Sequence, residues 1–148
     1  ELGLNDDKIV ELELFSTLHD IGKISIDRNI LTKTDKLSEE DWIELKKHPE
    51  VGYRIAQTVP ELVKISEYIL CHHERWDGTG YPQGLSKEEI PLLSRILAVV
   101  DAYDAMTQDR SYRKARPQTE AIEEILNNAG TQFDPEVAAI FVHKVLKK

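Results

Sequence analysis

Apolar residues recur at helical spacing along nearly the whole chain, and no stretch shows the period-two alternation that indicates a half-buried strand. The pattern is clear from the start of the sequence. After a potential N-cap at Asn5 or Asp6, the first apolar stripe consists of Ile9, Leu12, Phe15 and Leu18. The hydrophobic pattern therefore predicts an all-α protein.

Start and stop signals divide this pattern into about six to seven helices. Gly22 is expected to interrupt the first helix, and Ser38 with Asp41 approximates a capping box. Proline and glycine mark most other boundaries. The expected later helices cover 38 to about 48, 49–60, 62–73, 91–106, about 119 to just before 130, and a last helix from 135. Residues 74–91 form a glycine-rich loop, and we expect a single domain over 1–148.

Composition narrows the class of protein without indicating its chemistry. The 148 residues are 41% hydrophobic and 31% charged, as in ordinary soluble globular proteins. The net charge of −8 argues against binding to polymeric nucleic acid or to an anionic membrane surface. A single cysteine, Cys71, excludes an intramolecular disulfide, and no apolar run is long enough to span a bilayer. We therefore expect a cytoplasmic location and no membrane contact by this domain.

Histidine and aspartate positions provide the first chemical signal. The residues are His19 with Asp20, His48, the pair His72 and His73, and Asp101. Imidazole and carboxylate groups together suit Fe, Mn, Co, Ni or Zn. The two oxygens of Asp20 could bridge two ions, as two-metal phosphoesterase sites require.

Taken singly, each of these residues also has a structural explanation. A lone histidine near a helix end more often caps the last carbonyls than binds a metal, and His143 is assigned to such a structural role. Asp101 lies within the most apolar predicted helix, where a buried carboxylate needs a cation or hydrogen-bond donors. The joint pattern of the other residues favours a metal site.

Positive charge forms a second signal. Lys23 follows His19 and Asp20 by one turn, and four cations lie within seven residues: Arg110, Arg113, Lys114 and Arg116. Arginine and lysine bind phosphate oxygens, which indicates a phosphate-binding region. A solvated helix end, stabilised by the helix dipole, explains the same cluster equally well in isolation.

Four sequence blocks resemble a known family. Residues 19–23 (HDIGK) look like the HD signature of metal-dependent phosphohydrolases, and residues 72–82 (HHERWDGTGYP) resemble the HHExxDGxGYP motif of the HD-GYP subgroup. Residues 101–107 and 130–135 look like later blocks of the same subgroup. The two-residue HD motif is weak alone, whereas the eleven-residue block behind it is highly specific.

The resemblance implies a single HD-type helical bundle that hydrolyses cyclic di-GMP to pGpG or GMP at a binuclear, sometimes trinuclear, metal centre. Fe or Mn is the expected metal, with Ni, Co or Zn as alternatives. The implied ligands of one ion are His19, Asp20 and Asp101, and those of the other are Asp20, His48, His72 and His73. Asp20 and Lys23 are the implied catalytic residues.

The resemblance also suggests substrate and partner contacts. The implied phosphate-binding residues are Lys23, Arg110 and Arg113. The tripeptide Gly80, Tyr81 and Pro82 is implied to shape the mouth of the site and to contact diguanylate cyclase domains.

One departure from the family pattern concerns the start of the chain. Family members carry a further ligand histidine on a helix ahead of the HD block, whereas no histidine precedes Ile9 here. We interpret the chain, which begins at Glu1, as a fragment that lacks this helix, with weakened activity and a better second than first metal site. Two alternatives remain: a cyclic-dinucleotide receptor or docking module with little or no activity, and an HD hydrolase acting on another phosphoester.

Overall fold

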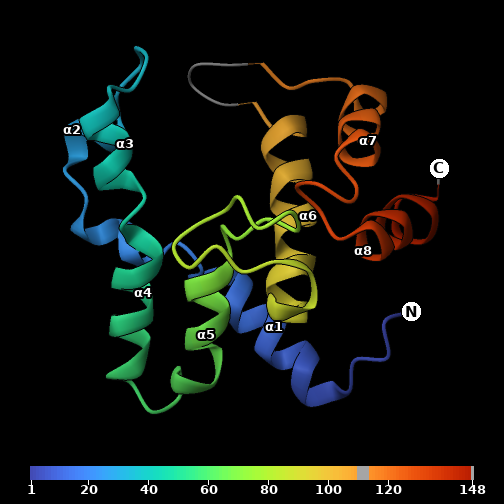
Figure 1. Ribbon diagram of the computed structural model, residues 1–148, viewed down its shortest axis with the longest axis horizontal. Coiled ribbons are helices and arrows are strands. Elements are labelled where there is room, and N and C mark those ends of the chain that lie inside the picture. Colours follow the sequence, from blue (N-terminus) through green and yellow to red (C-terminus); the bar gives the residue numbers. More distant parts are fainter. Residues whose placement is uncertain (110–113, 148) are drawn as a thin grey trace. The chain divides into compact units, whose positions relative to one another are not determined.

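The computed structural model describes residues 1–109 and 114–147, and in this part of the chain the regular elements are all helical (Figure 1). The all-α prediction is therefore confirmed. The elements in chain order are α1 (Asp6–Leu18), η1 (Ile21–Ser25), α2 (Arg28–Leu31), α3 (Glu39–Leu45), α4 (His48–Gln57), α5 (Val63–Cys71), η2 (Lys87–Glu89), α6 (Leu92–Thr107), α7 (Gln118–Asn127), α8 (Pro135–Ile140) and η3 (Phe141–Val145).

Several helix ends follow from local capping chemistry that the sequence already indicates. The side chain of Asn5 accepts a hydrogen bond from the Lys8 amide at 2.9 Å at the start of α1. Ser38 and Asp41 form the expected capping box of α3, and Asp134 caps α8. These side chains accept bonds from amides that have no partner within the helix, which is why the helices begin there.

Two local features differ from the sequence prediction. Helix α1 ends at Leu18, before Gly22, and Gly22 lies inside the 3₁₀ helix η1 rather than at a helix break. The short helix α2, whose first turn is capped by Asp27, was not predicted. Four residues are too few to show a hydrophobic period, so this helix leaves no periodic signal.

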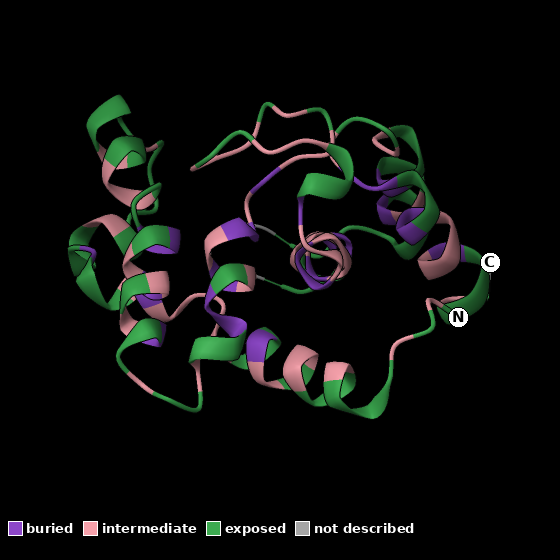
Figure 2. Ribbon diagram, turned by 60° about the horizontal axis from the view of Figure 1, so that its bottom comes forward, coloured by how far each residue is buried: buried purple, intermediate pink, exposed green. Residues whose placement is uncertain are grey.

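The chain divides into two compact units, the first comprising residues 1–73 and 81–83 and the second comprising 74–80 and 84–148. The single domain expected from the length stays a prediction. In the first unit, α4 packs against α5 and η1, and α1 packs against α5. Its core contains the fully buried side chains of Phe15, Ile65 and Ile69. Figure 2 shows buried residues as bands along the helices, as amphipathic helices require.

Glycine permits an unusually close approach between η1 and α4. A Cβ atom at Gly22 would lie 1.9 Å from the backbone oxygen of His48 and 2.6 Å from the amide nitrogen of Gly52. A Cβ at Gly52 would lie 2.8 Å from the side chain of Ile69 on α5. No side chain fits in either position without moving backbone or core atoms. The contact brings the residues before η1 next to the start of α4.

The second unit is built around α6, together with α7 and α8. Leu93, Leu97 and Val99 of α6 are buried, as are Ala121 and Ile125 of α7. Residues 74–80 are attached to this unit through backbone bonds: the amides of 76 and 77 donate to the carbonyls of 132 and 131, at 3.2 and 2.8 Å. No helix in the described part of the chain is long and apolar enough to cross a membrane.

Candidate metal centre

Four residues of the first unit place potential ligand atoms within 4.8 Å of one another: Asp20, His48, His72 and His73. We call these four residues the metal cluster. Asp20 lies between α1 and η1, His48 is the first residue of α4, and the two adjacent histidines directly follow α5. The chain departs from regular helix geometry after Cys71, so neighbouring side chains can turn toward one point. The contact at Gly22 adds His48 to the same point.

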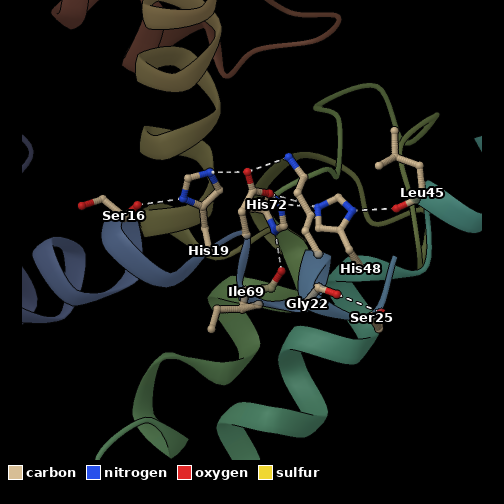
Figure 3. A network of polar contacts seen from close by, with 10 residues as sticks. Ser16, His19, Gly22, Ser25, Leu45, His48, Ile69 and His72 are labelled. Atoms are coloured by element: carbon tan, nitrogen blue, oxygen red, sulfur yellow. Dashed lines mark hydrogen bonds and ion pairs between the residues drawn. The ribbon is translucent and has the colours of Figure 1, made fainter. Parts of the chain in front are cut away.

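Three histidines are oriented in the same way by the backbone (Figure 3). In His19, His48 and His72, the Nδ1 atom lies 2.7, 2.7 and 2.6 Å from the carbonyl oxygen three residues earlier. A carbonyl can only accept, so each Nδ1 carries the proton and donates it. In a ring that carries this one proton, the Nε2 atom is left with a lone pair. Histidine ligands of metals characteristically show this arrangement.

The Nε2 lone pairs converge on one another and on a carboxylate. The Nε2 atoms of His48 and His72 are 3.1 Å apart, and Oδ1 of Asp20 lies 3.2 Å from the first and 3.6 Å from the second. Burial lowers the pKa of His72, and burial with the neighbouring histidines lowers the pKa of His73 to about 2. Additional protons on these rings are therefore disfavoured. A metal cation satisfies converging imidazole and carboxylate acceptors, so the residues fit a metal site.

The two oxygens of Asp20 face different groups. Oδ1 faces His48 and His72, whereas Oδ2 lies 3.5 Å from Nε2 of His19 and 2.7 Å from Nζ of Lys23. Burial would raise the pKa of Asp20, whereas the ammonium of Lys23, 2.7 Å from Oδ2, favours the charged form and helps to hold this pKa well below its usual range. The carboxylate is therefore ionised, and its geometry allows each oxygen to serve a different cation. His19 lies beside the metal cluster, on the Oδ2 side.

Tyr81 covers His73. The two rings are stacked with centroids 5.0 Å apart and planes inclined by 18°, and the Tyr81 amide donates to the His73 carbonyl at 3.2 Å. The ammonium of Lys46 lies 5.3 Å from the centre of the Tyr81 ring. Tyr81 therefore contacts both His73 and Lys46. Burial and the charge of Asp20 raise the pKa of Tyr81 to about 12, so the phenol stays protonated.

The remaining predicted site residues lie in the second unit, directly after Tyr81 in the first unit, or outside the described residues. Asp101 lies on α6 in the second unit and is exposed, so the expectation that it is buried was wrong. The reason is that α6 keeps a solvent face even though most of its residues are apolar: the adjacent Val100 is 40% exposed. Gly80 is the last residue of a second-unit segment, and Pro82 follows Tyr81 in the first unit. Arg110 and Arg113 lie outside the described residues.

Sequence reasoning missed the two glycines that set the cluster geometry. Gly22 was interpreted as a helix breaker and Gly52 was not considered, although both make close backbone contacts beside His48. The signal that could have found Gly22 is its position two residues after Asp20, where a polar site needs a close chain approach.

The all-helical fold and a histidine–aspartate cluster able to hold a metal ion are the features of an HD-type domain. The HD domain family matches residues 1–137, and the chain belongs to this family. Its block at residues 72–82 is of the HD-GYP type, as the sequence resemblance predicted.

Curated relatives and solved structures agree with this assignment. The chain is 41% identical over 144 residues to a cyclic di-GMP phosphodiesterase of Thermotoga maritima. This alignment covers 96% of the chain and 39% of that protein. It is 34% identical over 142 residues to a 3'3'-cGAMP-specific phosphodiesterase of Vibrio cholerae, covering 95% and 27%. A solved HDG"Y"P protein of Bdellovibrio bacteriovorus superposes with a TM-score of 0.74 at 25% identity, covering 99% and 47%. The chain thus spans less than half the length of each of these proteins.

Proposed function

We propose that the chain is a metal-dependent phosphodiesterase that hydrolyses a cyclic dinucleotide, with cyclic di-GMP as the first candidate and pGpG, GMP or both as products. The observation that carries this proposal is the convergence of Nε2 lone pairs on Asp20. Such a set of acceptors is stable around a cation and suits few other roles. The names of the relatives supply the substrate class.

The proposed ligand sets share Asp20. In this proposal His19, Asp20 and Asp101 would hold one ion, and Asp20, His48, His72 and His73 would hold the other. The separate directions of the two Asp20 oxygens support the sharing. Fe or Mn is proposed first, with Ni, Co or Zn as alternatives. Divalent cations at such a site polarise the phosphoryl oxygens and activate the attacking water.

Lys23 is proposed to contact both Asp20 and the substrate. Its ammonium donates to Oδ2 of Asp20 at 2.7 Å, which orients the carboxylate. Its side chain is partly exposed, with 38% of its surface accessible, so the same charge can face a phosphate oxygen. Arg110 and Arg113 are proposed to add the bidentate phosphate contacts that guanidinium groups provide.

The segment Gly80, Tyr81 and Pro82 is proposed to border the substrate entrance. Tyr81 supports this role because its ring lies directly on His73. Contact of this segment with diguanylate cyclase domains belongs to the same proposal and rests on the sequence resemblance. A cytoplasmic location is also proposed, on the composition of the chain and its single cysteine.

Hydrolysis can be tested directly with the metal-loaded protein. The chain is loaded with Fe or Mn and incubated with cyclic di-GMP, with cyclic GMP-AMP and with a noncyclic phosphodiester, and products are separated by chromatography. Release of pGpG or GMP is expected. His72→Ala should abolish turnover, whereas His143→Ala, which changes an exposed histidine of η3, should not. Recovery of intact cyclic di-GMP from a stable metal-loaded complex would instead support a receptor.

The substrate panel also separates the two enzymatic interpretations. A preference for cyclic GMP-AMP is the specific alternative, because a 34% identical relative is named for that substrate. Turnover of the noncyclic diester alone would contradict a cyclic dinucleotide substrate.

A further inference from the structure

A groove on α3 lies in the first unit and takes no part in the metal cluster. It is lined by Glu39, Trp42, Ile43 and Lys46, and we call it the α3 groove. Its volume of about 600 Å³ falls within the range of small-molecule sites. The lining residues follow the i, i+3, i+4, i+7 spacing of one helix face: α3 carries the first three, and Lys46 is its C-cap residue.

The groove exposes apolar surface that packing does not use. Trp42 is 46% exposed and Ile43 is 64% exposed. In the described part of the chain, the carboxylate of Glu39 has no hydrogen-bond or ion-pair partner. An indole face, an unused carboxylate and an ammonium group are thus available within two turns of helix.

These three groups match the functional groups of guanine. An indole face stacks on any nucleobase. A carboxylate accepts only, and the Watson–Crick edge of guanine presents two adjacent donors, N1–H and the N2 amino group. An ammonium group complements the O6 acceptor next to them. Adenine has an acceptor at N1, so a carboxylate that faces this position is repelled.

Two side-chain contacts link one end of the α3 groove to the metal cluster. Lys46 lies 5.3 Å from the centre of the Tyr81 ring, and that ring lies 5.0 Å from the ring of His73. In a cyclic dinucleotide, one sugar separates each base from the phosphates. The relevant pose has a phosphate at the metal cluster and one base past Tyr81, toward Lys46.

We infer that the α3 groove is the guanine subsite of the substrate, with Trp42 stacking on the base and Glu39 reading its Watson–Crick edge. The inference rests on the proposed function for the identity of the ligand. It commits to a cyclic dinucleotide that contains guanine, which both cyclic di-GMP and cyclic GMP-AMP do. Specificity for the base then depends on Trp42 and Glu39, which lie outside the HD and GYP blocks.

Binding without turnover provides the decisive test. Affinity for nonhydrolysable phosphorothioate analogues of cyclic di-GMP and of cyclic di-AMP is measured by calorimetry on the metal-loaded protein. Trp42→Ala should raise both dissociation constants about tenfold, and Trp42→Phe should recover most of the loss. Glu39→Gln should raise the cyclic di-GMP constant about tenfold and lower the cyclic di-AMP constant, because an amide can pair with adenine.

The matched control is Glu40→Gln, which changes the adjacent exposed carboxylate that does not line the groove. It should leave both constants unchanged, and thermal unfolding should show that all variants fold. Equal effects of Glu39→Gln and Glu40→Gln, or an unchanged ratio of the two constants, would overturn the inference. Either result would leave hydrolysis intact, whereas absent turnover with normal guanine selectivity would contradict only the proposed enzyme.

Discussion

The two units each contain a polar cluster with buried members, and the clusters differ in how their hydrogen-bonding groups are satisfied. In the second unit, Arg95 and Asp134 form an ion pair at 2.5 Å with side chains 15% and 3% exposed. Oδ1 of Asp134 accepts from the amides of Glu136 and Val137, and Nε of Arg95 donates to the Ile90 carbonyl. Every donor in these contacts meets an acceptor.

The metal cluster of the first unit is arranged in the opposite way. The Nδ1 protons of His48 and His72 are used by the backbone, and their Nε2 atoms face each other and Asp20. Acceptor faces acceptor, which is costly in a buried position unless a cation intervenes. A polar cluster whose donors and acceptors are all paired maintains the fold. A cluster in which acceptors face one another indicates a bound cation.

The strongest test of this contrast is Asp20→Ala. Removing the carboxylate that faces both sides of the site should reduce bound metal from about two equivalents to nearly none, and activity by at least about 1,000-fold. Elemental analysis of the metal-loaded protein measures the first effect and a turnover assay the second. Retention of the full metal complement would show that Asp20 is not a shared ligand.

Disruption of the Arg95–Asp134 ion pair in the second unit should instead lower the stability of the protein. Asp134→Ala leaves Arg95 buried without its partner and removes the cap of α8, so the free energy of unfolding should fall by about 3–5 kcal/mol. Urea unfolding measures this loss. Glu136→Gln, in the first turn of the same helix, is the matched control and should change stability by less than about 0.5 kcal/mol. Loss of metal from the folded Asp134→Ala protein would weaken the contrast between the clusters.

Gly22→Ala tests whether backbone proximity sets the metal cluster. The added Cβ would meet the His48 carbonyl at 1.9 Å, so η1 and α4 must separate. We expect a loss of about 1–3 kcal/mol in stability, together with weaker metal binding. Ile24→Ala in the same 3₁₀ helix removes a side chain that is 82% exposed and should alter neither quantity. Normal metal affinity in Gly22→Ala would show that the cluster tolerates displacement of α4.

The smallest expected effect concerns the turn at Asp77 in the second unit. Hydrogen bonds from Thr79 and Arg75 hold the pKa of Asp77 at about 2, below its ordinary value of 3.8. A depressed folded-state pKa means that the turn is fully stabilised above pH 3.8 and loses this stabilisation as pH falls through 2. The protection factor of the Thr79 amide, which is its intrinsic exchange rate divided by its observed rate, should therefore fall a few-fold over that range. Asp77→Asn should show faster exchange already at neutral pH, with a weaker pH dependence.

The sequence predicted the helices where local chemistry controls them. The caps at Asn5, Ser38 and Asp134 follow from side chains that bond to backbone amides within three residues. The four-residue helix α2 was missed because it is too short for a period, and Asp101 was wrongly expected to be buried because an apolar average does not identify a solvent face.

What the sequence determined by itself was the all-helical class, the HD and GYP blocks and the types of residue able to bind metal, because periodicity, capping and motif order are local properties. The tertiary structure decided which of those residues meet. Asp20, His48 and His72 come from three separate elements, and their meeting depends on the contact at Gly22, whose partners lie 26 and 30 residues further along the chain. The orientation of each histidine likewise depends on a carbonyl three residues away and on rings from other helices. Convergence of this kind is a property of packing, which residue spacing alone does not encode.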